Sequence, residues 1–458
     1  MIANIGCPSY RRLMSRRDVF RVGGAGLFGL SMSSILAAQA KAAKVGGRPA
    51  QAKQMIVLWQ GGGPPHTDMY DMKPDAPDNI RGAWKPIQSK QPGLLMNELM
   101  PELAKVADKF TILRSACNKK GYFDTHVEAG SWATLSGNDR RYIGTPHYPV
   151  IGNVMSKLGR GPSDVPAYLT LESDASNNPK TYGSYLGPAH DGMHLRLGKG
   201  GDNGRKLLDM LTPPPAQLDL PTLERRTEML RALDAQRQNF DAADALIAAQ
   251  DNATQKAFDI LTSPTLRQAL DLKREPEKSA QRYGRSEWAP RVLAARRLIE
   301  AGASCVFVNI SGWDFHYGSG GDSTYKHASG QFAKFSAVCA ALLEDLDERG
   351  LLDQTIVLAG GEMGRTPKAE RDGRGARGHW PNAMAYLLAG GGFRRGHIVG
   401  ATDKYGAEVT NLPYEAPSLA RTFYHLLGID ADQEFHTPDG RPLKIVTQDA
   451  PVITEALA

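Results

Sequence analysis

Three short apolar runs, each followed by acidic, histidine or arginine side chains, organise the sequence. Residues 55–59 (MIVLW) precede the turn GGGPP, residues 305–310 (CVFVNI) precede SGWDFH, and residues 355–359 (TIVLA) precede GGEMGR. Short apolar runs bounded by glycine or proline are typical of buried strands. Because ligands bind beyond the carboxyl ends of the strands in open α/β sheets, the three runs together predict one shared site.

The spacing of apolar residues along the rest of the chain predicts strands and helices in alternation. Further strands are expected at 110–113, 167–171 and 383–388. Helices are expected at 99–109, 126–135, 150–158, 289–301, 325–349 and 417–427. This alternation is typical of an α/β fold with a mostly parallel sheet covered by helices, and we expect that fold class here. The stretch 172–204, rich in asparagine, glycine, proline and histidine, is expected to be a long loop.

The segment 212–282 differs in character from the rest of the chain. It opens at a triplet of prolines and continues with a long helical pattern in which charged and apolar residues alternate. We interpret it as a helical insert in a core domain made of residues 53–211 and 283–458. The alternative, in which these helices are crossover connections of the main sheet, stays open.

Residues 1–40 have the features of an export signal. Arg16 and Arg17 form a twin-arginine pair, residues 22–36 are mildly apolar, and an Ala-Gln-Ala cleavage site closes the segment. This order is typical of a twin-arginine signal peptide, so we expect a periplasmic or otherwise exported protein with a polar linker at 41–52. A short amphipathic helix that stays attached is the alternative.

Charge and composition narrow the range of partners. The chain has 458 residues and a formal net charge of +6, with 41% hydrophobic residues and a mean hydropathy of −0.37. The leader holds five arginines and one aspartate, a net charge of +4, so the remainder carries +2 and nucleic acid is not an expected partner. No apolar run reaches the roughly 18 residues of a membrane span, so no transmembrane segment is expected after processing.

Three cysteines outside the leader and no C-x-x-C exclude a disulfide scaffold, and we expect Cys305 and Cys339 to be buried thiols.

The candidate site residues lie just beyond the predicted strands or at glycine-rich turns. Asp314 and His316 are spaced i, i+2, which puts both side chains on one face of an extended segment. The full set of candidate metal ligands is His66, Asp68, Asp314, His316, Glu362 and His379. Mixed histidine and carboxylate ligands are typical of Zn²⁺ or Mn²⁺ sites, and Ca²⁺ stays open where oxygens dominate. The alternative is that these polar groups cap helices and tie loops together.

Motifs along nearly the whole mature chain carry a family resemblance. They are WxGGGPPHxD, THVEAGSWATLSG, SGWDFH, GGEMGRTP, GHWPN, LLAGGGFRRGHIVGATD and DGRPL. Together with the leader they resemble the DUF1501 family, exported bacterial proteins without an established activity, over residues 53–456. That family is related by fold to alkaline phosphatases and sulfatases. The resemblance therefore implies a parallel sheet that carries one or two metals, with a nucleophile at the start of a helix.

The resemblance also implies roles for individual residues. The six candidate ligands fall at or near the ligand positions that the superfamily places after successive strands. The nucleophile position, counted back from Gly137, falls on Val127, which has no nucleophilic group, so Thr125 and His126 are the nearest candidates. Gly378 stands where members of the family often have aspartate. These departures bear on the nucleophile and on whether a complete two-metal site is present.

The combined pattern predicts an exported, metal-dependent hydrolase of phosphate or sulfate esters, including esters on glycans. Arg365 is expected to hold an anionic group of the substrate in a bidentate manner. Trp380 is expected to stack on a sugar ring. The alternatives are an ion pair under the glycine turn for Arg365 and core packing for Trp380. The alternative function is a non-catalytic binding or scaffold protein that keeps the fold without the nucleophile.

Overall fold

The computed structural model describes residues 50–118, 127–138, 148–172, 184–196, 263–316, 321–369 and 376–458. Ala50–Ala458 forms one compact unit. The expected leader, the candidate nucleophiles Thr125 and His126, and residues 212–262 of the expected helical insert lie outside the described residues.

A sheet of eight strands, in the order β12-β4-β11-β8-β1-β7-β5-β6, forms the centre of the described part of the chain. Its strands are β1 (Gln54–Trp59), β4 (Phe110–Ala116), β5 (Tyr168–Glu172), β6 (Met193–Arg196), β7 (Cys305–Asn309), β8 (Thr355–Gly360), β11 (Met384–Ala389) and β12 (His397–Val399). β11 runs antiparallel to its neighbours β4 and β8, and the other pairs are parallel. The predicted fold class, a mostly parallel sheet covered by helices, is therefore confirmed.

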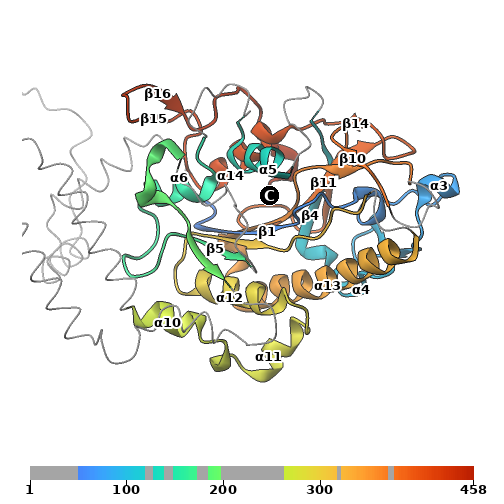
Figure 1. The fold of residues 1–458 in the computed structure, drawn as a ribbon, viewed down its shortest axis with the longest axis horizontal. Helices are drawn as coiled ribbons and strands as arrows, with labels where there is room; N and C mark the ends of the chain where they lie inside the picture. Colours follow the sequence, from blue (N-terminus) through green and yellow to red (C-terminus); the bar gives the residue numbers. More distant parts are fainter. Residues whose placement is uncertain are drawn as a thin grey trace, which may run out of the picture. The chain divides into compact units, whose positions relative to one another are not determined.

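Helices cover both faces of this sheet (Figure 1). One face carries α4 (Pro101–Lys105), α10 (Pro264–Leu270), α12 (Ala289–Glu300) and the long α13 (Gly321–Glu348), with α11 (Glu277–Arg282) packed on α13. The other face carries α5 (Val127–Ser136), α6 (Ile151–Lys157) and α14 (Ala416–Leu426). Within the described residues, no helix combines the length and the apolar character needed to cross a membrane.

The central strand β1 is buried on both sides, which is why its sequence is an almost continuous apolar run. Ile56 and Leu58 belong to the core under α12 and α13, whereas Met55, Val57 and Trp59 belong to the core under α5 and α14. A strand of this kind needs a helix layer on each side, and the chain supplies both.

Several elements differ from the sequence prediction. The helix expected at 99–109 is divided into α4 and a 3-10 turn, Ala107–Lys109, and its first turn begins at Pro101, a residue favoured at a helix start. The expected loop 172–204 contains the edge strand β6, which pairs with β5. β12 was not predicted, because a strand of three residues leaves too short a pattern to detect.

Four short two-stranded pairings complete the described part. They are β2 (Pro86–Gln88) with β3 (Leu95–Asn97), β9 (Gly364–Arg365) with β10 (His379–Trp380), β13 (Ala401–Thr402) with β14 (Val409–Asn411), and β15 (Glu434–His436) with β16 (Pro442–Lys444). Cys305 and Cys339 are buried thiols, as predicted, and Cys117 is buried as well.

The order of the sheet places the three site-bearing strands side by side. β1 lies between β8 and β7, and Trp59 at its end is aligned with Asn309 on one side and with Gly360 on the other. The loops that follow the three strands therefore leave the sheet at the same edge.

Candidate metal centre

The glycine turn after β1 packs against the loop after β7 at this edge of the sheet. The amides of Gly312 and Trp313 both donate to the Gly61 carbonyl at 3.2 Å, so the loop after β7 lies directly on the turn. Gly62 has a φ of +110°, and a Cβ atom built there would lie 2.6 Å from the Asp314 amide nitrogen. Only glycine permits this conformation and this close approach of two backbones.

Asp314 faces outward because its neighbour Trp313 is anchored in the core. The Trp313 indole is fully buried, donates to the Ile310 carbonyl at 2.7 Å, and stacks at 6.1 Å on the ring of Trp288. With the indole held in this way, the next residue points its side chain toward the edge of the sheet. The Asp314 side chain is 45% exposed.

His379 reaches the same place from a different direction. It begins β10, which pairs with β9 so that His379 is aligned with Arg365 in the loop after β8. This short antiparallel pairing carries the late histidine back to the ends of β7 and β8.

Asp314, His316 and His379 converge to form a cluster that fits a metal ion. The Asp314 carboxylate lies 2.9 Å from His316 Nε2 and 3.1 Å from His379 Nε2, and one ligand atom from each residue lies within 4.8 Å of the others. The two imidazole rings are perpendicular, with centroids 4.6 Å apart. Ligand atoms around a tetrahedral zinc ion at ~2.1 Å are separated by about 3.4 Å, so small movements would seat a cation here. Two imidazoles and one carboxylate fit Zn²⁺ or Mn²⁺ better than Ca²⁺, which prefers oxygen ligands.

Arg365 lies behind this cluster and is fully buried. Its guanidinium donates to the Asp314 carboxylate at 2.6 Å and to the carbonyls of Gly62, Gly63, Trp313 and Arg377. This is the alternative left open by the sequence, an ion pair under the glycine turn. Partial burial alone would raise the pKa of the Asp314 carboxyl, but the hydrogen bond and charge of Arg365 hold that pKa below its ordinary value.

The pKa of His379 is lowered. Partial burial is the largest cause, and the positive charge of Arg365 acts in the same direction against the opposing effect of Asp314. A lowered pKa keeps the imidazole neutral at physiological pH. A neutral imidazole has the free lone pair that a metal ion requires.

The other three candidate ligands are not part of the cluster among the described residues. His66 is buried, with Nε2 2.8 Å from the Gly406 carbonyl, and burial lowers its pKa. Asp68 accepts two hydrogen bonds of 2.7 Å from Arg377. Glu362 accepts a hydrogen bond of 2.7 Å from the Gly62 amide. In this structure the three polar groups tie the loops together, and a metal-binding role for them stays a prediction.

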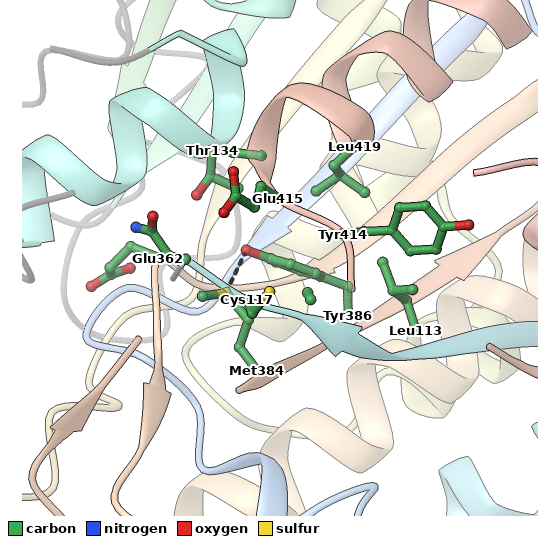
Figure 2. A pocket seen from close by; sticks show the side chains of 12 residues that line it. Leu113, Cys117, Thr134, Glu362, Met384, Tyr386, Tyr414, Glu415 and Leu419 are labelled. Atoms are coloured by element: carbon green, nitrogen blue, oxygen red, sulfur yellow. Dashed lines mark hydrogen bonds between the residues drawn. The ribbon is translucent and has the colours of Figure 1, made fainter. Parts of the chain in front are cut away.

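Figure 2 shows the surroundings of Glu362. Together with Glu415 and Tyr386 it lines a small recess. The Tyr386 hydroxyl donates to the Gly361 carbonyl at 3.0 Å, which ties this wall of the recess to the loop after β8. Two carboxylates make the recess unsuited to an anionic group.

The remaining predicted site residues occupy defined places or lie outside the described part. The half-buried Trp380 donates from Nε1 to the Ala407 carbonyl at 2.7 Å and packs beside Ala383 and Val409. Val127 is the first residue of α5, directly after the candidate nucleophiles Thr125 and His126, whose structure is not described. The proposed roles of Trp380, Thr125 and His126 stay predictions.

Arg377 has a larger part in the site than its sequence context suggested. Its guanidinium pairs with Asp68, and its backbone contacts the loop that carries Asp314 and His316. The available signal was its position two residues before His379, but an arginine in a glycine-rich stretch that also holds Arg371 and Arg374 is usually exposed to solvent.

The chain belongs to the family described as protein of unknown function (DUF1501), whose model matches residues 52–457. The motifs had predicted this membership. No curated protein matches the sequence.

Solved structures are similar to the chain only at a distance. The structure of Ps i-CgsB has 11% identity and a TM-score of 0.39 over 82% of this chain and 72% of its own. The phosphonate monoester hydrolase SpPMH from Silicibacter pomeroyi has 14% identity and a TM-score of 0.35, with coverages of 88% and 78%. The lipoteichoic acid synthase LtaP from Listeria monocytogenes has 12% identity and a TM-score of 0.34, with coverages of 84% and 74%. Likeness at this level carries no conclusion about activity.

Proposed function

We propose that this protein is a metal-dependent hydrolase of phosphate or sulfate esters, including esters on glycans. Asp314, His316 and His379 would hold one divalent cation. The observation that carries the proposal is the convergence of these three side chains, with ligand atoms within 4.8 Å of one another. Zn²⁺ or Mn²⁺ is the cation that the donor set favours.

The residues of the chain have distinct tasks in this proposal. Arg365 keeps Asp314 ionised, and the lowered pKa of His379 keeps its imidazole neutral, so both are ready to bind a cation at neutral pH. A divalent cation held there supplies Lewis acidity toward an ester oxygen. Thr125 and His126, directly before α5, are the proposed nucleophile candidates.

A specific observation favours a second candidate function, a binding or scaffold protein without catalysis. Val127 is the first residue of α5, at the position where the family resemblance places a nucleophile. In addition, the Arg365 guanidinium is buried in contacts with the protein itself, which leaves it poorly placed to bind a substrate anion.

The first experiment measures metal binding and activity on the same protein. We expect the melting temperature of the chelator-treated protein to rise when Zn²⁺ or Mn²⁺ is restored, because a ligand that binds only the native state at a hundred times its Kd adds about 2.7 kcal/mol of stability. Asp314→Asn should abolish this rise. Asp353→Asn, which removes an exposed carboxylate paired with Arg395, should leave it unchanged.

A screen with aryl phosphates and aryl sulfates then separates the two functions. Hydrolysis that depends on the metal and on Asp314 supports the hydrolase. Metal binding without hydrolysis supports the binding protein. If the wild-type protein binds no metal and its melting temperature does not rise when metal is added, both the cation site and the hydrolase proposal are ruled out.

We also propose export by the twin-arginine route, which rests on Arg16, Arg17 and the cleavage pattern near residue 40. The mature chain is expected to begin near Lys41. Intact-mass measurement of the protein recovered from its host tests this, and a mass that includes residues 1–40 would contradict it.

A further inference from the structure

Asp68 and Arg377 form a buried, bidentate ion pair next to the candidate metal centre. Both residues are at most 1% exposed, and Arg377 Nε and Nη2 donate to the two Asp68 oxygens at 2.7 Å. The rest of the guanidinium donates to the carbonyls of Ile80, Thr366 and Pro367. All five guanidinium N–H groups therefore have acceptors, and the orientation of Arg377 is fixed.

The backbone of Arg377 connects this pair to the three clustered residues Asp314, His316 and His379. Its amide donates at 2.9 Å to the carbonyl of Phe315, the residue between Asp314 and His316. Its carbonyl accepts from Arg365 Nη1 at 3.0 Å, and Arg365 in turn holds the Asp314 carboxylate. The third ligand, His379, follows two residues later in the chain.

We propose that Asp68 and Arg377 are positioning residues, which hold the Asp314-His316 loop and the His379 strand in register and take no part as metal ligands. This inference rests on the proposed metal site and deepens it. Asp68 anchors the guanidinium from the loop after β1, and the Arg377 backbone then fixes the distance between segments that lie after β7 and in β10. Loss of either partner would let the three ligands separate.

The alternative role for Asp68 is direct binding of the metal, which its position after the first strand suggested. The two roles predict different outcomes in a double-mutant cycle. A ligand acts without its ion-pair partner, so Arg377→Gln would leave a ligand role of Asp68 intact. A positioning pair acts as a unit, so loss of either member should have nearly the whole effect.

The experiment measures the Kd for Zn²⁺ in the full-length mature protein and in Asp68→Asn, Arg377→Gln and the double variant. We expect each single change to weaken zinc binding about tenfold or more, as is usual for groups that orient metal ligands. The Kd of the double variant for Zn²⁺ should exceed the larger of the two single-variant Kd values by no more than about threefold. Asp432→Asn, which breaks an exposed Asp–Arg pair with Arg421, is the matched control and should leave Kd unchanged.

Two results would overturn the inference. If Asp68→Asn loses zinc binding while Arg377→Gln keeps it within about threefold, Asp68 is a ligand. If neither single variant changes Kd, the pair is purely structural. Should the neutral variants fail to fold, Asp68→Glu and Arg377→Lys keep the charges but disturb the bidentate geometry, and the same comparison applies to them.

A second readout keeps the test independent of the proposed function. In the metal-free protein, the imidazole NMR signals of His316 and His379 should shift in both single variants and stay in place in Asp432→Asn. If wild-type protein binds no zinc, the proposed metal site fails, and these signals alone decide the positioning inference. Unchanged signals in both variants would refute it.

Discussion

At the scale of single residues, Gly62 is the position where backbone geometry and the candidate site depend most directly on each other. We expect Gly62→Ala to lower the free energy of unfolding by about 3 kcal/mol, because a non-glycine residue is strained at this φ and the new methyl group meets the Asp314 amide. Urea unfolding measures the loss. The zinc-induced rise in melting temperature should weaken in the same variant, because Asp314 is displaced.

Gly93 provides the control for this prediction. It has a φ of +80°, but a Cβ atom built there meets no atom within 4 Å. Gly93→Ala should therefore lower the free energy of unfolding only by the conformational cost of a non-glycine residue at positive φ, about 1 kcal/mol. The response of the melting temperature to zinc should stay unchanged. If Gly62→Ala and Gly93→Ala lower the free energy of unfolding equally, the contact of the new methyl group with the Asp314 amide contributes nothing to the loss.

The roles of the acidic side chains at this edge of the sheet could not be predicted from the sequence. Asp68, Glu362 and Asp314 all follow predicted strands, and their local patterns do not distinguish a ligand from an ion-pair partner. The partner of Asp68 is Arg377, which lies 309 residues away in the chain, and no local pattern connects them. Only the three-dimensional arrangement shows that Asp314, besides its ion pair with Arg365, clusters with two histidines, whereas Asp68 pairs with Arg377.

At the scale of elements, the described end of the expected helical insert is tied to the core. Leu266 and Leu270 of α10 are fully buried in the core under α12. Glu275, between α10 and α11, forms ion pairs with Arg296 and Arg297 of α12 and with Arg349 after α13. The segment that begins at Ser263 thus shares its packing with the α/β core, and the boundary expected at 282 stays a prediction.

The Glu275 network predicts a dependence of stability on pH. Burial alone would raise the pKa of Glu275, but hydrogen bonds from Arg296, Ser279 and Arg297 lower it to about 2. Because the folded pKa lies below the ordinary value of 4.5, the stabilisation is complete above about pH 4.5 and is lost as the pH falls toward 2. Glu275→Gln should lower the free energy of unfolding at pH 7 by about 3 kcal/mol and flatten its decline between these pH values.

Urea unfolding at a series of pH values checks this prediction. Glu434→Gln, at an exposed position in β15, should change stability by less than about 0.5 kcal/mol at every pH and leave the acid decline in place. An acid decline of the same size in Glu275→Gln and in the wild-type protein would assign the pH dependence to other carboxylates.

At the scale of the whole molecule, most of the sheet and its helices followed from the sequence. The apolar runs that became β1, β7 and β8 are buried on both faces, so hydrophobicity alone marked them. The sequence did not reveal that β11 runs antiparallel, because the direction of a strand is set by how its connections return and leaves no mark on side-chain alternation. Likewise, the pairing of β9 with β10 involves two residues in each strand, too few for any periodic pattern.

The position of β1 in the middle of the sheet has a consequence for how the protein is made. Among the described strands of the sheet, a ribosome synthesises β1 first, yet the partners of Met55 on its two sides are Cys305 and Ile356. For most of translation this apolar strand therefore has both edges open, and parallel pairing over such separations is slow. Unpaired apolar edges of this kind aggregate readily. We expect the nascent chain to depend on a chaperone that covers residues 54–59 until β8 has been synthesised.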